Sequence, residues 1–148
     1  MIERRRLLRV AGALTMLGYL PRVGANGTDV VAVYKSRTCG CCGEWVKHVE
    51  AGGLRVEVHE MDDMSPIRDR YGVPGALASC HTAVVSGYAI EGHVPAADIV
   101  RLLKERPKVR GLAVPGMVPG SPGMDQGPPQ HYATLAFDER GYRVFAQH

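Results

Sequence analysis

Between residues 29 and 60 the hydrophobic pattern changes its period twice. Residues 30–33 form a continuous apolar and mostly β-branched run, which is typical of a buried strand. Residues 44–51 carry their apolar side chains at helical spacing, and two glycines that follow them end the helix. Residues 54–59 then alternate apolar and polar side chains, as a half-buried strand does. The pattern predicts a strand, a helix and a second strand, which together make a βαβ unit.

Farther along, the pattern predicts two more helices and a pair of short strands. Residues 65–71 are typical of a short helix with proline in its first turn. Residues 82–85 and 88–91 predict two strands joined by a Ser-Gly turn, and a third helix begins at Pro95 and ends before Pro107. The resulting order, β-α-β-α-β-β-α, is that of the thioredoxin fold. We therefore expect an α/β protein with a thioredoxin-like mixed sheet flanked by helices.

The last third of the chain combines a segment rich in glycine and proline with a predicted hairpin. Residues 111–130 contain five glycines and five prolines, so we expect one long loop there. Loops of this length are usually functional or disordered. Residues 132–137 and 142–147 flank an Asp-Glu-Arg-Gly turn and predict a C-terminal β-hairpin.

The first 25 residues have the layout of an export signal. Four arginines precede an apolar stretch of eleven residues, which is too short to span a bilayer, and small residues suited to signal cleavage follow it. The string RRRLLR also resembles a twin-arginine signal, which exports an already folded protein. We expect residues 1–25 to be cleaved before Asn26, which leaves one periplasmic domain over residues 26–148. An uncleaved membrane anchor is the alternative.

Removal of this signal changes the charge of the protein. The full chain has a formal net charge of +3, but residues 1–25 hold five of its 18 basic and one of its 15 acidic side chains. Residues 26–148 therefore have a formal net charge of −1. Because this domain has no basic excess, we expect no nucleic-acid partner, and no membrane partner once the signal is cleaved.

Three of the four cysteines, Cys39, Cys41 and Cys42, lie within four positions directly after the first predicted strand. The thioredoxin order places Cys80 just before the third strand, where that fold keeps a proline that faces the redox turn. We therefore expect Cys80 and His81 to lie against the cysteine turn. The C-x-x-C spacing at a predicted helix N-terminus favours thiolates, which are needed both for nucleophilic attack and for metal binding.

This group of cysteines suits two different chemistries. A thiol–disulfide oxidoreductase needs only the C-x-x-C pair, and the extra thiol of Cys41 would scramble its disulfides. Three or four soft thiolates suit Cu(I), for which Met117, Met124 and His93 are further candidate ligands. Zinc takes the same donors, but structural zinc sites usually combine two short ligand pairs, and this chain has one. Copper binding is the first hypothesis, and thiol exchange with protein partners is the alternative.

Three stretches of the chain are similar to one bacterial family. They read YKSRTCGCCGEWVKHVE, YGVPGALASCHTAVVSGYAIEGHVPAADI and GLAVPGMVPGSPGM. Together they resemble the CopG-type copper-resistance proteins, which are thioredoxin-like and bind metal. The resemblance covers roughly residues 29–146, nearly all of the chain after the signal.

The resemblance implies a periplasmic protein that binds several copper ions through bridging cysteines. Carried over position by position, it implies metal ligands at Cys39, Cys41, Cys42, Cys80, His81 and Met117. We accordingly expect residues 26–148 to form a metal-binding domain that holds Cu(I) in copper resistance or homeostasis. Its expected partners are metal ions and periplasmic copper-handling proteins. Whether the site also changes the oxidation state of copper or of thiols stays open at this point.

Overall fold

The predicted order of elements, with one further strand inside the expected loop, is observed in the structure, a computed structural model that describes residues 29–148. The expected export signal, residues 1–25, lies outside the described residues. In the part that the structure describes, no helix is long and apolar enough to cross a membrane.

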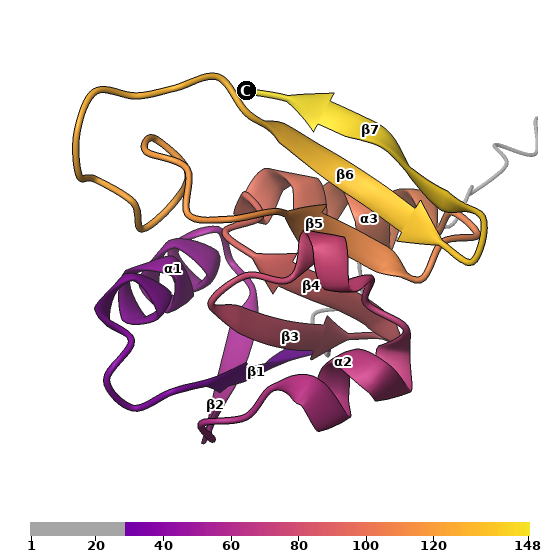
Figure 1. Ribbon diagram of the computed structural model, residues 1–148, viewed down its shortest axis with the longest axis horizontal. Helices are drawn as coiled ribbons and strands as arrows, with labels where there is room; N and C mark the ends of the chain where they lie inside the picture. Colours follow the sequence, from indigo (N-terminus) through magenta and orange to yellow (C-terminus); the bar gives the residue numbers. More distant parts are fainter. Residues whose placement is uncertain (1–28) are drawn as a thin grey trace, which may run out of the picture.

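One mixed sheet of seven strands forms the centre of the molecule (Figure 1). From one edge to the other, the strands are β2 (Arg55–Glu60), β1 (Val30–Lys35), β3 (His81–Val85), β4 (Tyr88–Gly92), β5 (Gly111–Val114), β6 (Ala133–Asp138) and β7 (Gly141–Gln147). The helices are α1 (Gly40–Ala51), α2 (Ser65–Tyr71), α3 (Ala96–Glu105) and a short 3-10 helix, η1 (Gly75–Leu77). The predicted mixed sheet flanked by helices and the C-terminal hairpin, β6 and β7, are confirmed.

The strand directions bring four strand ends to one end of the sheet. β1 is parallel to β2 and β4 is parallel to β5, whereas β3 is antiparallel to both β1 and β4. The register pairs Lys35 with His81 and Gly92 with Val114. The carboxyl ends of β1, β4 and β5 therefore meet the amino end of β3. The first turn of α1 follows β1 at this end of the sheet (Figure 1).

The two faces of the sheet are covered by different helices. Trp45 of α1 and Leu102 of α3 belong to the larger hydrophobic core, together with alternate residues of β1, β3, β4 and β5. Leu77 of η1 packs on the opposite face with Phe137, and Tyr71 at the end of α2 joins them. The face that a strand residue occupies therefore decides which helix it can contact.

Two boundaries differ from the sequence-based expectation. α1 begins at Gly40, not near residue 44, because residues 40–43 make its first turn and the Gly43 N–H donates to the Cys39 carbonyl at 3.3 Å. Glycine is a weak helix former, so the pattern conceals this turn. β5 lies inside the segment that was expected to be all loop. All four of its residues are buried, since it is held between β4 and β6.

The long loop of residues 115–132 is held by its own backbone and by α1. The Gly120 N–H donates to the Met124 carbonyl and the Gln130 N–H donates to the Pro119 carbonyl, both at 2.9 Å. Gly123 packs directly on α1, where a Cβ atom would come within 2.7 Å of the Cys41 carbonyl oxygen. A glycine is needed there, because any side chain would displace the loop from the helix. The loop therefore lies against the first turn of α1.

Candidate metal centre

The four cysteines come together at the N-terminus of α1. Cys39 is the N-cap residue, Cys41 and Cys42 lie in the first turn, and Cys80 precedes β3. All four sulfur atoms lie within 4.8 Å of one another. The expected approach of Cys80 to the cysteine turn is confirmed, although 38 residues separate Cys80 from Cys42.

In this structure two of the four thiols are joined. Cys39 and Cys42 form a disulfide, whereas Cys41 and Cys80 are free. The Cys41 sulfur lies 3.6 Å from the Cys39 sulfur. Because metal ligation by cysteine requires the thiolate, a site with four sulfur ligands exists only when this disulfide is reduced.

His93 points its Nε2 atom at Cys80. The distance from His93 Nε2 to Cys80 Sγ is 3.0 Å, and His93 Nδ1 lies 2.6 Å from the carbonyl oxygen of Pro122 in the long loop. A carbonyl oxygen only accepts, so Nδ1 carries the hydrogen and Nε2 presents its lone pair toward the sulfur. A carbonyl partner of this kind commonly fixes the tautomer of a metal-binding histidine.

His81 is fully buried beside the same thiol. Its Nδ1 atom lies 3.4 Å from Cys80 Sγ, and its ring centroid lies 4.3 Å from that of Trp45. Among the described residues, His81 Nε2 is the one buried side-chain nitrogen or oxygen without a hydrogen-bond partner. Such an atom is costly to bury, so its presence favours a ligand that it contacts in the working protein. Cys80, His81 and His93 form a second group of donors within 4.8 Å.

Burial sets the protonation states in this part of the site. It lowers the pKa of His81 to about 3, with help from the neighbouring His93, and it also lowers the pKa of His93. Burial, and after it the Cys41 thiol, raises the pKa of Cys80 to about 12. Both imidazoles are therefore neutral near pH 7, which is the form that binds metals, whereas Cys80 is a thiol until a cation displaces its proton.

The methionines of the long loop lie at the rim of this site. Met117 follows Gly116, whose carbonyl oxygen accepts a 2.6 Å hydrogen bond from Ser79 Oγ, but the Met117 side chain is 56% exposed. Met124 lines a surface cavity of about 320 Å³ together with Cys41. The loop therefore brings two thioether-bearing residues to the neighbourhood of the cysteines without burying Met117.

The sequence named these donors and predicted that Cys80 and His81 lie beside the cysteine turn, which the structure confirms. The ligand set implied by family resemblance omits His93, although its position after a predicted strand was a usable signal. It includes His81, which the structure places against Cys80. The pairing of Cys39 with Cys42 follows the C-x-x-C spacing, but spacing alone does not exclude a bond to Cys80.

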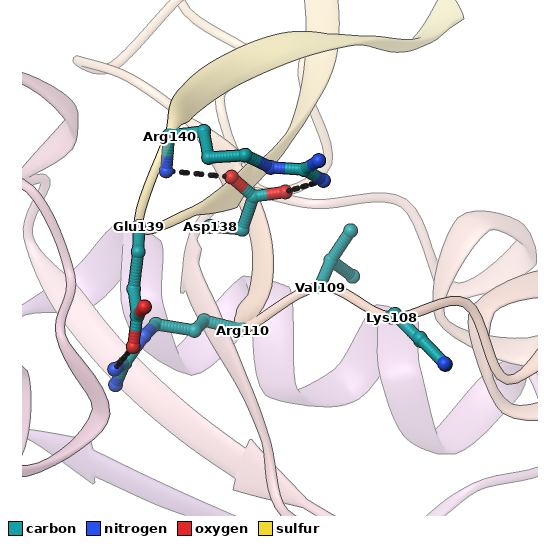
Figure 2. Close-up of a pocket in the computed structure, with 6 residues that line it drawn as sticks. All are labelled: Lys108, Val109, Arg110, Asp138, Glu139 and Arg140. Carbon is teal, nitrogen blue, oxygen red and sulfur yellow. Dashed lines mark hydrogen bonds and ion pairs between the residues drawn. The ribbon is translucent and has the colours of Figure 1, made fainter.

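Another hollow, at the opposite end of the molecule, has a different character (Figure 2). It has a volume of about 340 Å³ and is lined by Lys108, Val109, Arg110, Asp138, Glu139 and Arg140. Arg110 is paired with Glu139, and Arg140 is paired with Asp138 at 3.1 Å. The lining of this hollow contains no cysteine, methionine or histidine, so it offers a metal ion no soft donor.

Solved structures of copper resistance proteins are similar to this chain. Two forms of the copper resistance protein CopG superpose with a TM-score of 0.75 each, at 44% and 45% sequence identity. The matches cover 81% and 80% of this chain, and 98% and 96% of those proteins. The chain belongs to the CopG family. A family model described as a protein of unknown function, DUF411, also matches residues 77–124. No curated protein sequence matches significantly.

The DUF411 match covers one part of the centre. The DUF411 segment contains Cys80, His81, His93 and the two loop methionines, whereas the cysteines of α1 precede it. The structural match extends over four fifths of the chain. The expectation of a CopG-type protein is confirmed by this match.

Proposed function

We propose that this protein binds Cu(I) in the periplasm and acts in copper resistance or homeostasis. Its ligands would be the thiolates of Cys39, Cys41, Cys42 and Cys80, with the imidazoles of His81 and His93 beside them and Met117 at the rim. The observation that carries the proposal is the convergence of four sulfur atoms within 4.8 Å of one another. Copper resistance proteins with similar structures support the choice of metal.

The donor chemistry favours Cu(I) over harder cations. Thiolate, thioether and imidazole are the ligands that Cu(I) prefers, and a thiolate can bridge two ions. Four cysteines that lie this close can therefore hold more than one copper ion. His81 Nδ1, 3.4 Å from Cys80 Sγ, and the lone pair of His93 Nε2, 3.0 Å from it, supply neutral donors beside Cys80.

The disulfide couples copper binding to thiol redox state. Reduction of the Cys39–Cys42 bond takes up two electrons and two protons and yields two thiols, and each thiol loses its proton when it binds Cu(I). The oxidised protein retains Cys80, His81, His93 and the free Cys41. We infer that oxidation lowers the copper capacity without removing it.

The experiment is an anaerobic Cu(I) titration of residues 26–148 with elemental analysis and thiol counting. The fully reduced protein should bind at least one more copper ion than the protein with its disulfide intact. The proposal is wrong if the reduced protein binds no copper, or if both forms bind the same amount with the same affinity. Intact-mass measurement of the exported form tests the expected start at Asn26.

The disulfide also supports a second candidate function, thiol–disulfide exchange with protein partners. Replacing Cys41 by serine separates the two functions, because a dithiol made of Cys39 and Cys42 does not use Cys41. A copper site does, since a serine oxygen binds Cu(I) poorly. We expect Cys41→Ser to weaken Cu(I) binding by at least about tenfold, or about 1.4 kcal/mol. A variant that binds copper as the parent does and keeps full disulfide reductase activity would favour the exchange function.

A further inference from the structure

The segment that carries Cys80 lacks the proline that the thioredoxin fold keeps at this place. A buried carboxylate instead binds the residues on both sides of the Cys80–His81 pair. Glu91 lies in β4 and is fully buried. Its Oε1 atom accepts a hydrogen bond from the Ser79 backbone N–H at 2.6 Å, and its Oε2 atom accepts one from Thr82 Oγ1 at 2.6 Å. One carboxylate therefore contacts the residue before Cys80 and the residue after His81.

Arg68 completes this arrangement from α2. Its Nε and Nη2 atoms donate to Glu91 Oε1 at 3.1 and 2.8 Å, and Nη2 also donates to the Ser79 carbonyl oxygen at 2.6 Å. The Ser79 N–H and C=O groups are thus both bound by the same ion pair. The Ser79 side chain in turn donates to the Gly116 carbonyl of the long loop at 2.6 Å.

The ion pair reaches the site from the face opposite to the α1 cysteines. Thr82 and Glu91 are register partners in β3 and β4 and point toward the α2 side, whereas His81 packs against Trp45 of α1. Gly92 follows Glu91, and a Cβ atom there would lie 2.7 Å from the Ser79 Cβ atom. The end of β4 therefore packs on Ser79 as closely as a glycine allows.

We propose that Glu91 and Arg68 are positioning residues that hold the Cys80 thiol against the cysteines of α1. Neither side chain touches the metal in this proposal; both act through the backbone of Ser79 and the hydroxyl of Thr82. The role in metal binding rests on the proposed function, whereas the placement of the thiol does not. A buried ion pair is a poor source of stability, but it can specify one conformation of the segments that it joins.

The alternative is that Glu91 contributes only to stability, as any buried carboxylate with partners would. Asp98 provides the matched control. It is also buried, and it accepts hydrogen bonds from Thr134 Oγ1 at 2.6 Å and His148 Nε2 at 2.9 Å, with no hydrogen bond to the Cys80 segment. Neutralising either carboxylate should lower the melting temperature. Only the Glu91 change should alter the Cys80 thiol.

The first test is free of metal and uses a background in which Cys80 is the one free thiol. In Cys41→Ser with the Cys39–Cys42 disulfide intact, iodoacetamide alkylates Cys80 alone. The reaction is run without denaturant, and its rate is measured by intact-mass spectrometry. Adding Glu91→Gln should raise the alkylation rate by roughly tenfold, because the buried segment opens more often. Thr82→Val, which removes one hydrogen bond and keeps the ion pair, should raise it by about threefold. Asp98→Asn should leave the rate within about twofold of the background.

The second test restores Cys41 and measures Cu(I) affinity of the reduced proteins by competition with a chelator. Glu91→Gln should weaken binding by about tenfold at unchanged stoichiometry, and Asp98→Asn should not. If neither Glu91→Gln nor Thr82→Val changes alkylation more than Asp98→Asn does, the positioning role is wrong. If alkylation responds but the parent protein binds no copper, the positioning role stands and the proposed copper function fails.

Discussion

The two halves of the cysteine site differ in how their positions are determined. The α1 half (Cys39, Cys41 and Cys42) lies in one helical turn, and its disulfide joins two residues of that turn. The strand half (Cys80, His81 and His93) comes from the start of β3 and the residue after β4. It depends on hydrogen bonds from the loop and from the opposite face of the sheet.

This difference separates two properties that a copper site needs. The α1 half can change its redox state, because a C-x-x-C pair can form or break its disulfide within one turn. The strand half provides neutral imidazoles and a protonated thiol whose states are set by burial. In the proposed copper site, the α1 half would control how much copper is held, and the strand half would keep a donor group in place throughout.

The largest expected effect concerns the strand half and the pH dependence of stability. His81 has a pKa of about 3 in the folded protein against an ordinary value of 6.5. Between these two pH values the unfolded chain therefore binds a proton at His81 and the folded protein does not. Stability is therefore present above pH 6.5 and is lost as the pH falls toward 3. Between pH 6.5 and 4 we expect a loss of roughly 3 kcal/mol in the free energy of unfolding of the metal-free protein.

Denaturant unfolding at several pH values measures this loss. His81→Gln should flatten the dependence over that range, and His131→Gln, a change at an exposed histidine, serves as the control. An unchanged slope in His81→Gln would show that the strand half is more hydrated than its burial indicates.

The next effect tests whether Cys80 is shared by both groups of donors. Cys80 belongs to the four-sulfur group and to the group with two histidines, whereas Cys41 belongs to the first alone. We expect Cys80→Ser to weaken Cu(I) binding by about 100-fold, or about 2.8 kcal/mol, which is more than Cys41→Ser does. Chelator competition on reduced proteins gives both values. Equal losses of Cu(I) affinity in the two variants would contradict the sharing of Cys80. They would show that the two halves act as a single site.

The smallest effect concerns the rim of the site. Met117 is 56% exposed, so as a proposed ligand its thioether would lie at the surface of the centre. We expect Met117→Leu to weaken Cu(I) binding by about threefold, which is below 1 kcal/mol. Met124→Leu, a matched change in the same loop, should have less effect. A loss above tenfold in Met117→Leu would mean that the loop closes over the copper and buries this thioether.

Local patterns in the sequence determined most of the strands and helices of this protein. The periods of residues 30–60 predicted β1, α1 and β2, and the glycine-bounded alternation at the C-terminus predicted β6 and β7. The thioredoxin-like order of elements also predicted that Cys80 lies near the cysteine turn, as observed. The strands, helix and turns follow from short-range rules, since side-chain period and turn residues act over a few neighbouring residues at a time, whereas the approach of Cys80 follows from the expected order of strands.

Tertiary structure decided the features that depend on distant partners. β5 is a strand because β4 and β6 pair with both its sides, although its own sequence lies in a stretch rich in glycine and proline. The Pro122 carbonyl selects the tautomer of His93, and the Arg68–Glu91 pair anchors the Cys80 segment from the other face of the sheet. No local pattern marks Glu91, because a charged residue in a predicted strand is ordinarily expected on the solvent side. The reason is physical: buried polar groups must find partners in three dimensions, and those partners lie far away along the chain.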